Sequence, residues 1–279
     1  MGDERQTPAV LGTDRGASRR SAIDPFIVMD VMRAANARDA SDLARSAPAS
    51  ERVIHMEVGQ PGTAAPRLAR EAALRAMEGT TLGYTEALGL PELRARIARL
   101  YKEWYGIPLS PERVIVTAGS SGAFILAFLS LFDAGDTLAL PAPGYPCYRH
   151  ISSALGLKTH TLVTGERGRW MPYAKEIAEL AAANTIAGVL LASPANPTGT
   201  MLPADRLAAI AQTCAARRIW FISDEIYHGL TYEAPAQTAL QYSDQAIVIN
   251  SFSKYFSMTG WRIGWMGVPG SLVRPIERL

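Results

Sequence analysis

Cysteine is scarce in this chain. Cys147 and Cys214 show no metal or redox spacing, so we expect a protein of the reducing cytoplasm. The four histidines are scattered and form no pair of metal ligands. The formal net charge of +2 gives no basic excess for binding nucleic acid, and the longest apolar run, residues 123–132, is too short to cross a membrane. We therefore expect an ordinary soluble protein with no metal and with neither nucleic acid nor a membrane as its partner.

The first 20 residues lack the apolar segment that a secretion signal needs. They are polar and rich in arginine, and three acidic residues interrupt the basic ones, which is untypical of a transit peptide. We predict that residues 1–20 form a disordered leader. The rest of the chain is long enough for one large domain with its own core and for part of a second domain.

Beyond the leader, apolar residues alternate between helical spacing and short continuous runs. Helical spacing predicts helices that begin near Pro25 and that cover residues 67–78, 91–105, 123–132 and 203–217. Short apolar runs predict strands in the stretch GDTLAL and over residues 53–58, 114–117, 188–192, 219–223 and 246–249. This alternation predicts an α/β fold in which right-handed crossovers join a mostly parallel sheet.

One predicted turn between a strand and a helix consists of small residues: Gly119, Ser120, Ser121 and Gly122. A helix start presents unpaired N–H groups and the positive end of the helix dipole. Glycine lets the backbone approach a ligand and serine adds a hydroxyl, so the turn predicts an anion site. It matches neither a Walker loop nor the GxGxxG motif of a dinucleotide site. A small-residue turn without a ligand would look similar, so both interpretations stay open.

Polar side chains follow three other predicted strands. Tyr145 lies between a glycine and a proline, Asn196 lies in a proline-rich loop, and Asp224 and Tyr227 follow a buried run. Ligands of open α/β sheets bind at the carboxyl ends of the strands, so these side chains are expected to face one crevice. Taken alone, Tyr145 could serve only in packing, and Asp224 could be the N-cap residue of a following helix. The turn at Gly59 either brings backbone close to a ligand or is only a turn.

Lys254 stands in the stretch NSFSKYFSMTGWRIGW, among hydroxyl and aromatic side chains and with no acidic neighbour. A free lysine amine has a pKa of about 10.4 and is almost wholly charged at neutral pH. Burial or a nearby cation lowers that pKa and makes the amine a nucleophile. The serines and Arg262 are groups that a phosphate binds. The stretch thus predicts a Schiff-base lysine beside an anchored phosphate, with a strand end that carries one snorkelling lysine as the alternative.

The motifs SPANPTG, SDEIY and SFSKYFSMTGWRIGW together resemble those of the class I/II aminotransferases, the fold type I pyridoxal-phosphate enzymes. The resemblance extends from residue 23 to the end. It implies an aspartate-aminotransferase-like fold: a mostly parallel, seven-stranded sheet sandwiched by helices, with an N-terminal helical arm and a truncated C-terminal small domain. The implied divisions are an arm over residues 21–58, a cofactor-binding large domain over 59–270 and the start of a linker helix over 271–279.

The resemblance also implies how the ring of pyridoxal 5'-phosphate is held. Lys254 would form the Schiff base with the cofactor and act as the base for proton transfer. Asp224 would pair with the pyridinium nitrogen. Asn196 and Tyr227 would hydrogen-bond the ring hydroxyl, and Tyr145 would stack on the ring.

Phosphate and substrate contacts follow from the same resemblance. The phosphate would be bound at the helix start and by two residues of the lysine stretch, namely Gly119, Ser120, Ser121, Ser251 and Arg262. Tyr84 matches a tyrosine that reaches the phosphate of the partner subunit, which implies a homodimer. Gly59, together with Tyr145 and Asn196, would bind the substrate.

The implied activity is transfer of an amino group from an L-amino acid to a 2-oxo acid. The amino acid stays open, because the turn VGQPGTAAP lacks acidic residues that family members usually carry there. We expect the chain to lack the C-terminal domain whose arginine binds the substrate α-carboxylate in this family. Two alternatives remain: a carbon–sulfur lyase or other β-elimination enzyme of the same fold, and a pyridoxal-phosphate-binding fragment without catalysis.

Overall fold

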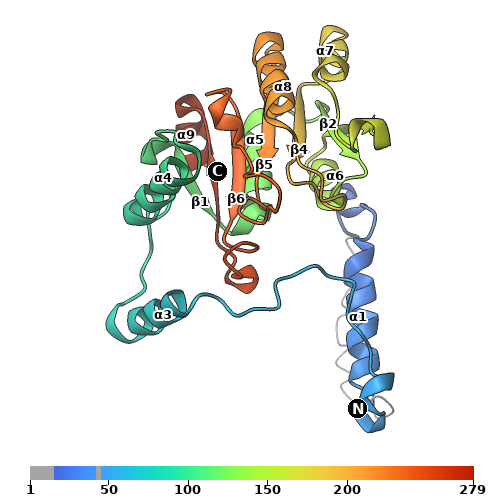
Figure 1. Cartoon of the computed structure of the whole chain (residues 1–279), viewed down its shortest axis with the longest axis vertical. Helices are drawn as coiled ribbons and strands as arrows, with labels where there is room; N and C mark the ends of the chain where they lie inside the picture. Colours follow the sequence, from blue (N-terminus) through green and yellow to red (C-terminus); the bar gives the residue numbers. More distant parts are fainter. Residues whose placement is uncertain (1–15, 42–44) are drawn as a thin grey trace, which may run out of the picture.

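The computed structural model describes residues 16–41 and 45–279. The predicted leader therefore lies largely outside the described residues, and within its last part a short 3-10 turn begins at Arg19. The centre of the fold is a seven-stranded sheet with the strand order β1-β7-β6-β5-β4-β2-β3 (Figure 1). Only β7 runs antiparallel to its neighbours, β1 and β6. The predicted α/β class with a mostly parallel sheet is confirmed.

The strands are short and mostly buried on both faces. Their bounds are β1 Val114–Thr117, β2 Thr137–Ala142, β3 Lys158–Val163, β4 Gly188–Ala192, β5 Trp220–Asp224, β6 Ile247–Ser251 and β7 Gly264–Gly267. Every residue of β4, β6 and β7 is buried. A continuous apolar run suits such a strand, because helices cover both of its faces.

Helices form a layer on each side of the sheet. Their bounds are α1 Ile27–Asp39, α3 Arg67–Gly79, α4 Pro91–Tyr105, α5 Gly119–Leu131, α6 Pro146–Ala154, α7 Ala174–Ala182, α8 Ala204–Arg217 and α9 Gly270–Glu277. Buried side chains of α4, α7 and α8 belong to one core cluster, and those of α5, α6 and α9 belong to a second. Alternate side chains of the central strands enter the two clusters, so the sheet separates two cores. Each fully buried aliphatic side chain stabilises the fold by about 1.5–3 kcal/mol.

Two helices of the N-terminal part contribute no side chain to either core cluster. Helices α1 and α3 extend away from the sheet (Figure 1), and both expose apolar side chains. Ile27 and Val31 of α1 are exposed, as are Leu68 and Met77 of α3. None of the helices in the described part of the chain is long and apolar enough to cross a membrane.

Two local predictions were wrong. Residues 53–58 form no strand; the side chains of Ile54 and Met56 are exposed, and no strand lies beside them to accept their backbone hydrogen bonds. The small-residue segment before residue 123 is not a separate turn, because α5 already begins at Gly119. Serine and glycine are tolerated there, since the first N–H groups of a helix have no partner within the helix.

Candidate active site

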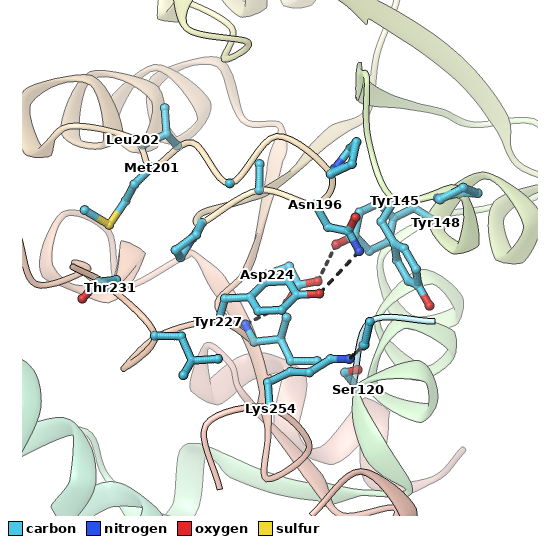
Figure 2. A pocket seen from close by; sticks show the side chains of 18 of the residues that line it. Ser120, Tyr145, Tyr148, Asn196, Met201, Leu202, Asp224, Tyr227, Thr231 and Lys254 are labelled. Carbon is cyan, nitrogen blue, oxygen red and sulfur yellow. Dashed lines mark hydrogen bonds between the residues drawn. The ribbon is translucent and has the colours of Figure 1, made fainter. Parts of the chain in front are cut away.

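A cavity of about 920 Å³ opens where β4, β5 and β6 end. The loops after these strands carry Asn196, Tyr227 and Lys254, while Asp224 is the last residue of β5 (Figure 2). Most of the residues singled out in the sequence line this one cavity: Gly59, Ser120, Ser121, Tyr145, Asn196, Asp224, Tyr227 and Lys254. Parallel strands explain this convergence, because their carboxyl ends meet at one edge of the sheet.

Lys254 enters the cavity from the loop after β6. Its Nζ donates a hydrogen bond of 2.9 Å to the carbonyl oxygen of Gly59, and it lies 6.0 Å from the centre of the Tyr227 ring. The side chain is half-buried. Burial, and then the nearby charge of Arg262, lower the pKa of the Lys254 amine. More of this amine is therefore neutral and nucleophilic than in a solvated lysine.

Asp224 is buried at the floor of the cavity. Its Oδ2 accepts a hydrogen bond from the Tyr148 hydroxyl, and its Oδ1 accepts one of 3.0 Å from the backbone N–H of Ile226. Burial raises the pKa of Asp224 to about 6, although both hydrogen bonds favour the charged form. A cationic group in the cavity would therefore stabilise the Asp224 carboxylate.

Asn196 and Tyr227 meet across the cavity from two different loops. The Asn196 amide nitrogen lies 3.4 Å from the Tyr227 hydroxyl oxygen. Both groups are partly buried and point into the same space as Lys254 (Figure 2). Together they offer an amide and a phenol to one polar atom of a ligand.

Tyr145 forms a further wall of the cavity. It is the N-cap residue of α6, which begins at Pro146. Its ring makes edge contacts with Tyr148 at 5.4 Å and with Phe26 at 6.1 Å between centroids. Burial raises the pKa of Tyr145 to about 12, so the hydroxyl stays protonated at neutral pH. These contacts hold an aromatic ring at the cavity, where a flat ligand can pack on it.

The first turn of α5 lies against Arg262. Gly119 has a φ of +72°, and a Cβ built on it would lie 2.5 Å from the guanidinium nitrogen of Arg262. A Cβ on Gly264 would lie 2.8 Å from the backbone nitrogen of Ser120. Glycine at both positions lets β7 and Arg262 reach the helix start. A guanidinium and a helix N-terminus together favour an anion.

Four expected contributors are not among the residues that line the cavity, namely Gly119 and Arg262, described above, and Ser251 and Tyr84. Ser251 is buried at the end of β6, and its Oγ accepts a hydrogen bond of 3.1 Å from the backbone N–H of Ser253. The Tyr84 side chain is fully exposed on the segment between α3 and α4, and the structure does not bring it to the cavity. That Tyr84 reaches the phosphate bound by a second subunit remains a prediction.

Tyr148 contributes to the site but was not singled out from the sequence. Its hydroxyl is the side-chain donor to Asp224, and the residue is buried. The signal that was available is its spacing from Tyr145, because three positions along the first turn of a helix place two side chains on one face. Glu57 and Phe26 of the arm also line the cavity and were likewise not foreseen.

The family model "Aminotransferase class I and II" matches residues 51–278. The chain belongs to this family. It is 48% identical over 271 residues to the valine–pyruvate aminotransferase of Mycobacterium tuberculosis, an alignment that covers 96% of this chain and 66% of that protein. It is 33% identical over 240 residues to the aspartate aminotransferase of Pyrococcus horikoshii, covering 85% and 61% of the two chains. The chain thus spans slightly less than two thirds of the length of these relatives.

Solved structures agree with this class I/II assignment. A crystal structure of an aminotransferase from Mycobacterium tuberculosis matches with a TM-score of 0.87 and 46% identity, over 94% of this chain and 66% of the other. The aspartate aminotransferase of Thermus thermophilus with maleate matches with a TM-score of 0.86 and 27% identity, over 95% and 67%. The aspartate-aminotransferase-like fold implied by the sequence motifs is therefore confirmed.

Proposed function

We propose that this chain is the cofactor-binding part of a pyridoxal-phosphate-dependent aminotransferase, which moves an amino group from an L-amino acid to a 2-oxo acid. The observation that carries the proposal is a half-buried lysine of lowered pKa in the same cavity as a buried carboxylate. Lys254 and Asp224 are the two groups that a pyridoxal ring requires, an amine for its aldehyde and an anion for its ring nitrogen.

The residues present also fit the phosphate group of this cofactor. A phosphate needs positive charge and N–H donors, and the start of α5 offers both beside Arg262. The close approach of Arg262 depends on the missing side chain of Gly119. In the proposed arrangement the phosphate is held by Gly119, Ser120, Ser121, Ser251 and Arg262.

The ring is held by groups from three loops. Asp224 stays ionised when a protonated nitrogen faces it, and the Tyr148 hydroxyl keeps that carboxylate oriented. Asn196 and Tyr227 bond the ring hydroxyl, and Tyr145 packs against one face of the ring. Bound in this way, the cofactor supplies an electron sink for the negative charge that develops at the substrate Cα.

Proton transfer falls to the Lys254 amine. It can take the Cα proton only in its neutral form, and its lowered pKa raises the share of that form at neutral pH. The carbonyl of Gly59, 2.9 Å away, accepts a hydrogen bond from the amine and keeps it directed into the cavity. Half-burial keeps part of the solvent away from the amine during the transfer.

The amino donor is proposed to carry a small aliphatic side chain. The relative of 48% identity is named for valine and pyruvate. The arm contributes Phe26, Val28 and Met29 to the cavity wall, which gives an apolar side chain a surface to pack on. Gly59, Tyr145 and Asn196 are proposed to contact the substrate at the opening toward Lys254.

We propose further that the protein is a homodimer and that it works in the cytoplasm. Exposed apolar side chains on α3, among them Leu68, Leu74 and Met77, suit burial against a second copy of the chain. Tyr84 lies in the segment just after this helix and is fully exposed, as a residue that reaches into a neighbouring subunit has to be.

The test is product formation by the purified chain with pyridoxal phosphate, L-valine and pyruvate. We expect a 2-oxo acid that forms only when pyruvate is present. Lys254→Ala abolishes its formation, whereas Lys175→Ala, which removes an exposed lysine on α7, leaves it unchanged. Release of ammonia without an acceptor would identify an elimination enzyme instead. Cofactor binding with neither product would reduce the proposal to a cofactor-binding fragment.

A further inference from the structure

His228 is buried just beyond the cavity, and its ring nitrogens have two different partners. Nε2 lies 2.9 Å from the backbone carbonyl oxygen of Ser193, which can only accept a hydrogen bond. The hydrogen of the neutral ring is therefore on Nε2, and Nδ1 accepts from the Tyr105 hydroxyl at 2.6 Å. Burial lowers the pKa of His228 to about 4, so the ring stays neutral at physiological pH. One tautomer is thus fixed by its surroundings.

Ser193 is the point at which two loops of the site are joined. Its backbone N–H donates to the carbonyl oxygen of Asp224 at 3.1 Å, and its carbonyl oxygen accepts from His228. Its Oγ accepts a hydrogen bond of 2.9 Å from the backbone N–H of Leu202. The first bond attaches Ser193 to the last residue of β5, the second attaches it to the turn that follows β5, and the third closes the loop that carries Asn196.

Each of the two loops carries one residue of the pair Asn196 and Tyr227 that meets at the cavity. Asn196 is three residues beyond Ser193, and Tyr227 directly precedes His228. The Asn196 amide nitrogen lies 3.4 Å from the Tyr227 hydroxyl oxygen, and among the described residues no other hydrogen bond joins these two loops at the cavity itself. Their separation therefore depends on the attachment behind them.

We propose that His228 is a positioning residue for cofactor binding: its Nε2–H bond to the Ser193 carbonyl fixes the Asn196 loop to the Tyr227 turn. This inference rests on the proposed function for its link to the ring hydroxyl. The hydrogen bond that joins the two loops, by contrast, is present without the cofactor. The two parts can therefore be tested separately.

Three variants separate the hydrogen bond from simple packing. His228→Phe keeps a ring of similar size and removes the donor to Ser193. His228→Gln is the conservative variant, because its side-chain amide can place an N–H near the position of Nε2. Tyr105→Phe is the control, because it removes the other partner of the ring and leaves the Nε2–H bond in place.

The first measurement is amide hydrogen exchange of the chain without cofactor. His228→Phe is expected to speed exchange at the N–H groups of Ser193 and Leu202 about fivefold, as for the loss of one net hydrogen bond. His228→Gln and Tyr105→Phe are expected to stay near the unmodified chain at these two sites. Equal exchange in His228→Phe and His228→Gln would overturn the inference.

The second measurement is the pH midpoint of the visible absorbance of the chain with pyridoxal phosphate. This midpoint depends on the hydrogen bonds to the ring hydroxyl, so it should shift in His228→Phe and return in His228→Gln. A changed loop exchange with an unchanged midpoint would overturn the positioning role. If the unmodified chain takes up no cofactor, the proposed function fails, and the exchange experiment still decides whether His228 joins the loops.

If His228→Phe does not fold, the proposal is tested instead by the protonation of the His228 ring in the unmodified chain. Nitrogen NMR is expected to show the hydrogen on Nε2 and no titration of the ring between pH 5 and pH 7, which lies above the pKa of His228 of about 4 and below the pKa of about 8 of Glu225, whose Oε2 lies 3.7 Å from Nδ1. A hydrogen on Nδ1 would contradict the bond to Ser193 and overturn the inference.

Discussion

Glu225 is a buried acid whose replacement by glutamine should change how stability depends on pH. Its Oε1 accepts hydrogen bonds from the hydroxyls of Ser223 and Thr238 and from the backbone N–H of Ala239. Its Oε2 has no hydrogen-bond partner among the described residues. Burial raises the pKa of Glu225 to about 8, so the folded chain holds this proton at pH values where the unfolded chain has released it.

The sign and the size of the effect follow from linkage. Between the ordinary pKa of 4.5 and about 8 the folded state binds more protons than the unfolded state, so the free energy of unfolding falls as pH rises. The whole interval corresponds to about 5 kcal/mol, at about 1.4 kcal/mol per pH unit. Glu225→Gln keeps an oxygen for the three donors and does not titrate. Its stability relative to the unmodified chain should therefore increase by about 4 kcal/mol from pH 5 to pH 8.

The assay is urea unfolding of the cofactor-free chains at pH 5 and pH 8, followed by circular dichroism. Asp224 also titrates in this range and is present in both chains; its charge is one of the smaller causes that raise the pKa of Glu225, so that interaction is part of the expected difference. Glu112→Gln, at an exposed position, is the matched control and should behave like the unmodified chain at both pH values. An equal difference between Glu225→Gln and the unmodified chain at pH 5 and pH 8 would refute the reasoning.

Three further changes test other parts of the structure. Tyr148→Phe removes a donor to the buried Asp224 carboxylate, so we expect about tenfold weaker binding of pyridoxal phosphate by absorbance titration; unchanged affinity would contradict this role. Gly119→Ala places a Cβ against Arg262 at a positive φ, so it should lower stability by about 1–2 kcal/mol and weaken competition by inorganic phosphate for the cofactor site. Ile222→Ala empties a fully buried position of β5 and should cost about 2–5 kcal/mol in urea unfolding, whereas a cost below 1 kcal/mol would mean that the core is not packed as described.

Strands with continuous apolar runs were predictable from the sequence. The bounds predicted for residues 114–117 and 188–192 are those of β1 and β4. The segment 53–58 has a similar composition but is no strand, because pairing depends on a neighbour that a local pattern cannot show. β7 was not predicted from its residues, since its two glycines and its short length give a weak local signal. Its antiparallel place between β1 and β6 is set by packing across the sheet.

The candidate site was predictable where a residue ends a strand or lies a few positions beyond it. Asn196, Asp224 and Lys254 all do so, and the shared edge of a parallel sheet brings them to one cavity. Tyr148 and His228 could not be assigned in this way. Their roles depend on partners 76 and 35 positions away in sequence, which no local spacing shows.

The most direct test of the central claim is chemical trapping of the cofactor on the chain. The purified chain with pyridoxal phosphate would be reduced with borohydride, digested and examined by mass spectrometry, beside Lys254→Ala and Lys175→Ala. We expect a phosphopyridoxyl group on Lys254 in the unmodified chain and in Lys175→Ala, and none on the corresponding peptide of Lys254→Ala. Label spread over exposed lysines, with Lys254 unmodified, would contradict the assignment of this cavity as the cofactor site.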